Sequence, residues 1–141
     1  MTEPGWSLHP QLANDTVPVG ELALSRVLAI NSADYPWLIL VPRRLHVTEI
    51  ADLGADAFPL MAEIALASLA LKEVTQCDKI NVAALGNMVP QLHIHIVARC
   101  KTDPLWPKPI WGAEPPRAGD AAAFARFVGE IREKLGAVEV G

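Results

Sequence analysis

The sequence predicts an α+β domain with an antiparallel sheet of about five strands, a long central helix and a C-terminal helix. Short apolar runs separated by turn residues indicate the strands, and a long Ala- and Leu-rich stretch indicates the central helix. These elements do not alternate regularly as strand and helix, which argues against a parallel sheet. A chain of 141 residues fits one domain, so we expect a single domain over residues 1–141, with its core at about 23–112.

Two hairpins supply most of the expected strands. Residues 22–30 read as a first strand, the turn-like Asn31–Asp34 follows, and the short apolar run Trp37–Val41 pairs back against it. Further along, Lys79–Leu85 and Gln91–Arg99 are strand-like runs joined by Gly, Asn and Pro residues. That composition is typical of a turn, so these two runs are expected to form a second hairpin.

The central helix is expected over about Ala57–Gln76, where Ala, Leu and Met favour helix formation. Asp56 is its expected N-cap, and Pro59 is tolerated in the first turn, where its missing N–H needs no partner. The apolar run within it is shorter than the roughly 20 residues of a membrane span and contains Glu63, so we expect a buried core helix. Glu63 is expected to face solvent or to be paired, rather than to be catalytic.

A proline-rich segment and a final helix follow the second hairpin. Three prolines exclude regular structure from Asp103–Gly112, so this segment is expected to lie over the sheet as an extended strap. A helix is expected over about residues 120–135, with Asp120 as its N-cap. Five apolar residues share one face of that helix, namely Phe124, Phe127, Val128, Ile131 and Leu135.

Charge and composition narrow the classes of partner. A formal net charge of -4 disfavours general binding to the nucleic-acid backbone, so we expect a small-molecule ligand and no nucleic acid. The N-terminus has neither a basic nor an apolar leader, and Cys77 and Cys100 are too few for a disulfide framework. We therefore expect a soluble cytoplasmic protein with reduced thiols and no membrane partner.

The strand Gln91–Val97 contains the residues best suited to chemistry. Alternate side chains of a strand share a face, so Gln91, His93 and His95 are expected on one face and apolar residues on the other. Imidazole is well suited to nucleophilic and proton-transfer work near neutral pH. The plainer interpretation is that the two histidines are polar residues on a solvated sheet face.

This strand resembles the signature of the histidine triad (HIT) family, His-φ-His-φ-His-φ-φ, in which φ is apolar. Gln91-Leu92-His93-Ile94-His95-Ile96-Val97 matches that signature at every position but the first. The resemblance extends upstream to the first hairpin, to the run Leu-Ile-Leu-Val-Pro-Arg-Arg with His46 after it, and to the long helix. It covers about residues 23–112.

The resemblance implies a nucleotide-binding hydrolase or transferase that acts at an α-phosphate. By this resemblance His93 is the nucleophile, forming a covalent nucleotidyl-histidine that divides one phosphoryl displacement into two steps. His95 and His46 are implied to lie beside the phosphate, where they would stabilise charge on its oxygens or on the leaving group.

Substrate-binding roles are expected for five further residues: Gln91, Asn87, Gly86, Arg99 and Trp111. Gly86 and Asn87 look like the family's loop before the histidine strand, which holds phosphate oxygens. Trp106 and Trp111 suggest stacking on a nucleobase, although burial of their indoles against the sheet or a partner subunit is the simpler interpretation. The resemblance also implies a homodimer formed around the central helix and the last strand, and no metal or organic cofactor.

Gln91 is the departure from the family pattern and leaves two interpretations open. A glutamine amide cannot titrate near neutral pH. If the first position acts only through its backbone carbonyl, Gln91 keeps that function. If an imidazole is needed there, the protein is a slower or redirected enzyme, or a non-catalytic nucleotide-binding module.

A metal-dependent enzyme is the third interpretation. His93 and His95 could supply two imidazole ligands to zinc, copper, iron or nickel. A third ligand would have to come from His46, Cys100 or a distant carboxylate. The sequence also leaves the leaving group open among an amine, a second nucleotide, a sugar phosphate and an adenylate anhydride.

Overall fold

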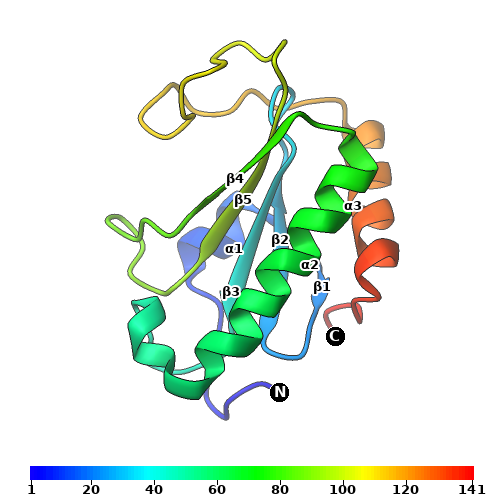
Figure 1. Ribbon diagram of the computed structural model, residues 1–141. Helices are drawn as coiled ribbons and strands as arrows, with labels where there is room; N and C mark the ends of the chain where they lie inside the picture. The colour runs from blue at the N-terminus through cyan, green and yellow to red at the C-terminus, as the bar shows by residue number, and fades with distance from the viewer.

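The computed structural model describes residues 1–141 and contains a five-stranded antiparallel sheet in the order β1-β2-β3-β5-β4 (Figure 1). The predicted α+β class and antiparallel sheet are confirmed. The strands are Val17–Glu21 (β1), Ser25–Ile30 (β2), Trp37–Pro42 (β3), Lys79–Ala83 (β4) and Ile94–Arg99 (β5).

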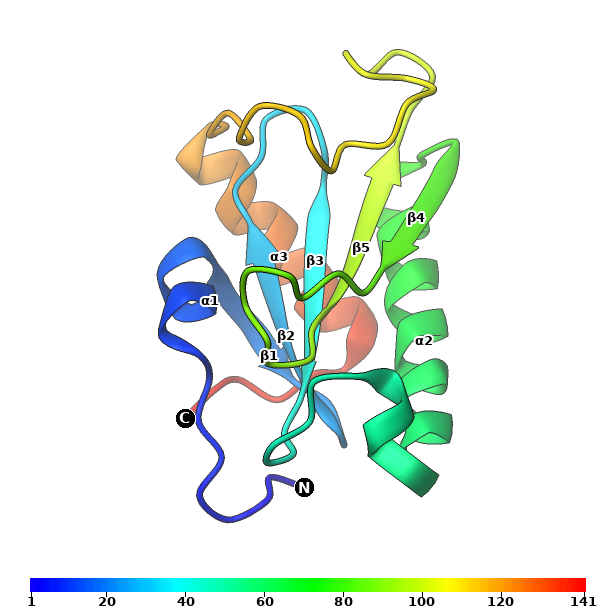
Figure 2. The same ribbon diagram turned by 90° about the vertical axis from the view of Figure 1, so that its left-hand side faces the viewer.

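Four helical segments surround the sheet: α1 (Pro10–Asp15), the 3-10 helix η1 (Ile50–Asp56), α2 (Ala57–Thr75) and α3 (Ala121–Leu135). Helices α2 and α3 cover one face of the sheet, while α1 lies on the other (Figures 1 and 2). Figure 2 views this second face, which the loop between β4 and β5 also crosses. The predicted positions of α2 and α3 are confirmed.

The structure contains three elements that the sequence did not predict: β1, α1 and η1. β1 includes Pro18 and Gly20, which are poor strand formers, and it pairs with β2 at the sheet edge with a bulge between them. The run expected as the first strand begins at residue 22, but pairing with β3 begins only at Ser25. α1 has six residues, too few to show a helical period in the sequence.

The sheet separates two apolar clusters, and β5 contributes to both. Ile94, Ile96 and Ala98 pack with residues of α2 and α3, whereas Val97 packs with Trp37 on the opposite face. The five apolar residues predicted to share one face of α3 all join the first cluster. Because side chains alternate along a strand, His93 and His95 lie on the Val97 face, away from α2.

The expected helix caps have different outcomes. Asp120 caps α3, because its carboxylate accepts from the backbone N–H of Ala123 at 2.9 Å. The prediction for Asp56 was wrong: its backbone is already helical where η1 runs into α2, and its side chain makes no cap bond. The Asp56 carboxylate accepts instead from Arg44 Nε at 2.8 Å, so it joins the loop after β3 to the start of α2.

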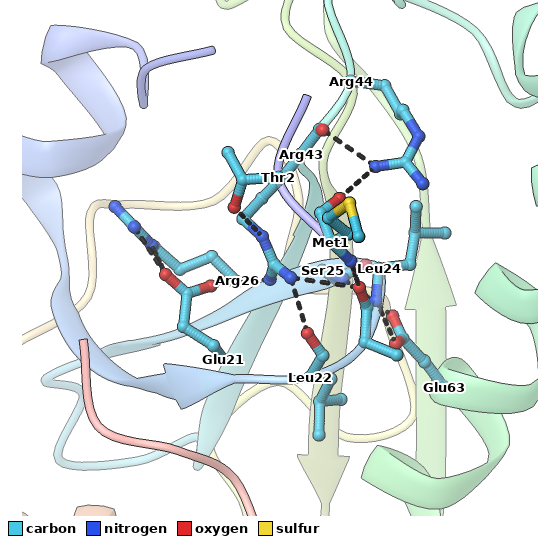
Figure 3. A network of polar contacts seen from close by, with 11 residues as sticks. Met1, Thr2, Glu21, Leu22, Leu24, Ser25, Arg26, Arg43, Arg44 and Glu63 are labelled. Atoms are coloured by element: carbon cyan, nitrogen blue, oxygen red, sulfur yellow. Dashed lines mark hydrogen bonds and ion pairs between the residues drawn. The ribbon is translucent and has the colours of Figure 1, made fainter. Parts of the chain in front are cut away.

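Two buried charged side chains hold the turn between β1 and β2 (Figure 3). The carboxylate of Glu63 on α2 is paired, as expected, but with backbone: it accepts from the N–H groups of Leu24 and Ser25 at 2.8 and 3.0 Å. Arg43 lies nearby with 4% of its surface exposed and donates to Glu21 at 2.6 Å. Its remaining hydrogen bonds go to Thr2 Oγ1 and to the carbonyls of Leu22 and Ala23.

The helical stretch Ile50–Thr75 is long and apolar enough, by length and composition alone, to cross a membrane. It is longer than the apolar run seen in the sequence because η1 precedes α2 directly. A core helix passes the same test, and α2 packs on the sheet through its buried residues Leu60, Ile64, Ala67 and Leu71. Its outer face is also apolar and stays exposed at Phe58, Met61, Leu66 and Leu69.

Candidate active site

His93 and His95 lie side by side on the sheet face opposite α2. His95 is the second residue of β5, paired with Ile39 of β3 and Ala83 of β4, and His93 directly precedes the strand. Their ring centroids are 5.0 Å apart with the ring planes at 70°. Only 7% of His93 and 9% of His95 are exposed. The central position in the sheet therefore holds both imidazoles in fixed orientations.

A backbone carbonyl determines which nitrogen of His93 carries its proton. His93 Nδ1 lies 2.7 Å from the carbonyl oxygen of Gln91. A carbonyl can only accept, so Nδ1 is the protonated nitrogen and donates to it. Neutral His93 therefore has its lone pair on Nε2. The residue at position 91 orients this ring through its backbone, which a glutamine does as well as a histidine.

His95 has the opposite tautomer. Trp37 Nε1, which can only donate, is 3.0 Å from His95 Nδ1, so the proton of the neutral ring is on Nε2. Burial, with a smaller contribution from His93, lowers the pKa of His95 to about 4. At neutral pH the ring is uncharged. The pair thus combines an unprotonated nitrogen on His93 with an N–H donor on His95.

A large hollow begins beside His95, and we call it the aromatic hollow. Trp37 and Trp111 both meet the His95 ring edge to face, with centroids 5.7 and 5.9 Å away. The two indoles line a cavity of about 820 Å³ between the loop after β2 and the segment after β5. The other lining residues are Asp34, Tyr35, Pro104, Leu105, Ile110 and residues 112–117. Trp111 is therefore next to the histidine pair, and its substrate-binding function stays a prediction.

The segment after β5 closes this hollow at the upper end of the sheet in Figure 2. It is a series of turns rather than the extended strap expected. Asp103 organises it: its carboxylate accepts from Arg99 at 2.7 and 3.0 Å and from the backbone N–H groups of Cys100, Leu105 and Trp106. The hydrogen bonds from Arg99 hold the pKa of Asp103 below its usual range.

Arg99 lies apart from the histidine pair. Only 1% of its surface is exposed, and its guanidinium also donates to Asn81 and lies over the rings of Tyr35 and Trp106. Six residues of β-like chain separate it from His93, a span of roughly 20 Å. These contacts give Arg99 a structural function in fixing the segment after β5.

The side chain of Gln91 binds the N-terminal segment. Its Oε1 accepts from the backbone N–H of His9 at 2.8 Å, and its Nε2 donates to the carbonyl of Ser7 at 3.0 Å. This bond places the backbone of His9 beside Gln91, although His9 was not among the residues predicted for the site. The pair His9-Pro10 is typical of a helix start, but no local pattern predicts a contact 82 residues away.

A second, smaller cavity of about 280 Å³ adjoins Gln91, and we call it the N-terminal hollow. It is lined by Gly5, Trp6, Ser7, His9, Arg44, Leu45, His46, Val47, Thr48, Pro90 and Gln91. His46, expected beside the phosphate, is exposed on this wall and has a left-handed backbone with φ of 58°. No hydrogen bond or ring contact joins His46 to His93.

Gly86 and Asn87 lie in the loop between β4 and β5. Gly86 has φ of 78°, a conformation that glycine adopts most readily. Asn87 is exposed and its side chain makes no hydrogen bond. The phosphate-binding function of both residues stays a prediction.

The histidine pair does not extend to a metal-ligand cluster. No group of three or more His, Cys, Asp or Glu side chains is close enough together to hold a metal ion. Nδ1 of His95 is already bonded to Trp37, which leaves that ring only Nε2 for a ligand. Cys100, considered as a third ligand, follows the far end of β5.

Comparisons with known proteins agree with this geometry. The HIT domain family model matches residues 11–102. A histidine triad protein from Bradyrhizobium japonicum is 53% identical, with a TM-score of 0.90 over 94% of this chain and 99% of that one. Histidine triad proteins from Marinobacter aquaeolei and Sinorhizobium meliloti are 41% and 37% identical, each with a TM-score of 0.88. They cover 93% and 92% of this chain and 96% and 97% of their own. A search of curated proteins finds no match.

These structures share the fold with this chain over nearly their whole length. The family model covers well over half of the 141 residues and includes the strand with His93 and His95. The chain therefore belongs to the histidine triad (HIT) family.

Proposed function

We propose that the protein is a nucleotidyl hydrolase or transferase in which His93 attacks the α-phosphate of a nucleotide conjugate. The observation that carries this proposal is the 2.7 Å contact between His93 Nδ1 and the Gln91 carbonyl. With its proton held on Nδ1, neutral His93 has a lone pair on Nε2, which is the state a nucleophile requires. The substitution of glutamine at position 91 leaves this arrangement intact.

The reaction proceeds in two displacements at phosphorus. In the first, a bond forms between His93 Nε2 and the α-phosphorus while the bond to the leaving group breaks; the leaving group takes the electron pair and, if it is an amine, a proton from solvent. The imidazole becomes positively charged, and the Gln91 carbonyl stabilises that charge through Nδ1–H. In the second, water or another hydroxyl acceptor attacks phosphorus and releases its proton to solvent, while the P–Nε2 bond breaks and its electron pair returns to Nε2, so that neutral His93 is regenerated.

His95 is proposed to bind a non-bridging oxygen of the reacting phosphate. Its Nε2–H is a donor at neutral pH, since the pKa near 4 keeps the ring uncharged and Nδ1 is occupied by Trp37. A fixed donor in a water-poor site stabilises developing negative charge without reorganising.

The aromatic hollow is proposed to bind the nucleoside. Its volume of about 820 Å³ is within the usual range of small-molecule sites, about 300–1,000 Å³. Tyr35, Trp37 and Trp111 offer aromatic surface for a base. The carboxylates of Asp34 and Glu114 are acceptors for the hydroxyl groups of a ribose.

The test uses wild-type and His93→Ala protein with a fluorogenic adenosine phosphoramidate. Turnover together with a nucleotidyl adduct, detected by mass spectrometry of the quenched wild type and absent in the variant, is the expected result. Nucleotide binding without turnover in the wild type would favour the non-catalytic module. Stoichiometric metal in the purified protein would favour the metal-dependent alternative.

We also propose a homodimer formed through the outer face of α2 and the edge strand β4. The resemblance implied the last strand, but β5 lies between β3 and β4, so the sheet edge on that side is β4. The exposed apolar residues gather there: Phe58, Met61, Leu66 and Leu69 on α2, and Val82, Leu85 and Met88 on β4 and its following loop. Apolar patches of this kind mark interaction sites. Sedimentation equilibrium should give a dimer for the wild type and a folded monomer for Met61→Glu. A wild-type monomer would contradict this assignment.

We place the protein in the cytoplasm. Both cysteines, Cys77 and Cys100, are free thiols, as is usual in a reducing compartment. Fractionation of the native cells should recover the protein with cytosolic markers, and its recovery in a membrane or secreted fraction would contradict this.

A further inference from the structure

The two residues before His93, Gln91 and Leu92, form hydrogen bonds to the two walls of the N-terminal hollow. The side-chain amide of Gln91 binds the backbone of Ser7 and His9, which form one wall. The backbone N–H of Leu92 donates to the carbonyl of Val47, on the other wall, at 3.0 Å. The hollow is therefore fixed next to the point where the chain enters the histidine pair.

The lining of this hollow suits an anion. Its lining residues include Arg44, His9 and His46 and no Asp or Glu, although the carboxylates of Glu3 and Asp52 accept from the backbone N–H groups of the lining residues Leu45 and Thr48. Two of the three guanidinium nitrogens of Arg44 already have partners within the protein. Its Nε donates to Asp56, whose carboxylate offsets some of the positive charge, and its Nη1 donates to the carbonyls of Met1 and Arg43. Its Nη2 donates to no group of the protein and stays available to a ligand.

His9 presents a defined donor. Its Nδ1 accepts from the backbone N–H of Gln11 at 3.1 Å, so the proton of the neutral ring is on Nε2. Its own backbone N–H is held by Gln91. The ring is thus fixed from both sides, with an N–H for which no partner exists within the protein.

The charge of the leaving group decides which lining suits it. An amine takes up a proton as it leaves phosphorus and carries no negative charge away. A phosphate or pyrophosphate leaves as an anion and needs no proton in that step. It needs hydrogen-bond donors and positive charge, which are the groups that line the N-terminal hollow.

We infer that the N-terminal hollow receives a phosphate or pyrophosphate leaving group and that His9 selects for it. This inference rests on the proposed function and narrows its substrate to a nucleoside polyphosphate-type anhydride. In the first displacement the bridging P–O bond breaks, and its electron pair goes to the departing phosphate oxygen, which His9 Nε2–H and Arg44 bind. The volume of about 280 Å³ fits such a group better than a second nucleotide.

The first experiment compares two adenosine substrates with the same nucleoside, ATP and a fluorogenic adenosine phosphoramidate. The variant is His9→Asn, because asparagine keeps the acceptor that caps α1 and removes the ring donor. The ratio of kcat/KM for ATP to that for the phosphoramidate should fall at least tenfold. An unchanged ratio would overturn the inference. Asn14→Ala, an exposed change on the same helix, is the matched control and should leave the ratio alone.

The second experiment needs no catalysis. Inorganic pyrophosphate is titrated into wild-type and His9→Asn protein, with the histidine ring resonances followed by NMR. We expect the rings of His9 and His46 to shift and the Kd to rise at least tenfold in the variant. Failure to bind, or equal Kd values, would overturn the anion site. If pyrophosphate binds as expected but the wild type turns over neither substrate, the proposed function fails, and the leaving-group assignment falls with it while the anion site stands.

Discussion

Two hollows on one sheet face differ in charge, size and construction. The aromatic hollow is larger, is lined by three aromatic rings, and carries the carboxylates of Asp34 and Glu114. The N-terminal hollow is smaller, has no carboxylate among its lining residues, and carries Arg44 and two histidines. His95 adjoins the first through Trp37 and Trp111, and Gln91, bonded to His93, borders the second. The contrast gives the proposed site a direction, with the nucleoside expected at one end and the anion at the other.

The two hollows are also held by different interactions. A buried ion pair between Arg99 and Asp103 fixes the segment that closes the aromatic hollow. Neutral hydrogen bonds from one amide, Gln91, fix the wall of the N-terminal hollow. Each hollow can therefore be altered by a separate substitution. Removal of the buried ion pair at the aromatic hollow should lower stability more than removal of the Gln91 hydrogen bonds at the N-terminal hollow.

Asp103→Asn should have the largest effect. The Arg99–Asp103 side chains are 2% and 3% exposed, and loss of one charge leaves the other buried without its partner. We expect the free energy of unfolding, measured by urea denaturation, to fall by about 3–5 kcal/mol. Adenosine affinity should fall as well, because the segment lining the aromatic hollow is released.

The matched control for Asp103→Asn is Asp34→Asn. Asp34 pairs with Arg117 at the mouth of the same hollow, where the side chains are 25% and 73% exposed. An exposed pair of this kind contributes at most about 1 kcal/mol. Asp34→Asn is the control for stability only, and equal losses in the free energy of unfolding of the two variants would show that the Arg99–Asp103 pair does not hold the segment.

The pH dependence of the free energy of unfolding tests the burial of His95, which lies between the two hollows. The pKa of His95 is lowered to about 4 by burial and by His93, from 6.5 for an exposed histidine. The unfolded chain therefore binds this proton more tightly, so stability is full above pH 6.5 and falls as the pH drops toward 4. The loss over that window should be about 3 kcal/mol, followed by urea denaturation at several pH values.

His95→Gln should remove most of that pH dependence, since glutamine does not titrate. Trp37→Phe should reduce it, because loss of the hydrogen bond to Nδ1 makes protonation of the folded protein easier. NMR titration of the His95 ring would report the pKa directly. A value near 6.5 in the wild type would contradict the burial argument.

Gln91→Ala should loosen only the N-terminal hollow. Two hydrogen bonds to the segment at Ser7 and His9 are lost, at a cost of about 2 kcal/mol. The orientation of His93 should survive, because its partner is the backbone carbonyl of residue 91. Hydrogen exchange at the His9 amide should rise markedly, while adenosine affinity stays constant. Gln76→Ala, an exposed glutamine bonded only within its own helix, is the control.

The fold and the site could be predicted from the sequence to different extents. The central helix, α3 and three of the strands follow from composition and periodicity, and the histidine strand from a local pattern. β1 was missed because Pro18 and Gly20 conceal an edge strand. The contact between Gln91 and the segment at His9 links residues far apart in sequence, and no local pattern encodes such a contact. Arg99 likewise seemed free only because its partner, Asp103, belongs to a turn whose shape the sequence did not specify.

The smallest expected change in stability is at His46, on the wall of the N-terminal hollow. Its φ of 58° is uncommon for a residue with a Cβ, and such a conformation costs about 1 kcal/mol or more relative to glycine. His46→Gly should therefore be more stable than His46→Ala by about 1 kcal/mol, as urea denaturation would show. Both variants lose the imidazole, so both should bind pyrophosphate more weakly to the same degree. Weaker binding in the alanine variant alone would mean that backbone geometry, and not the ring, serves the anion.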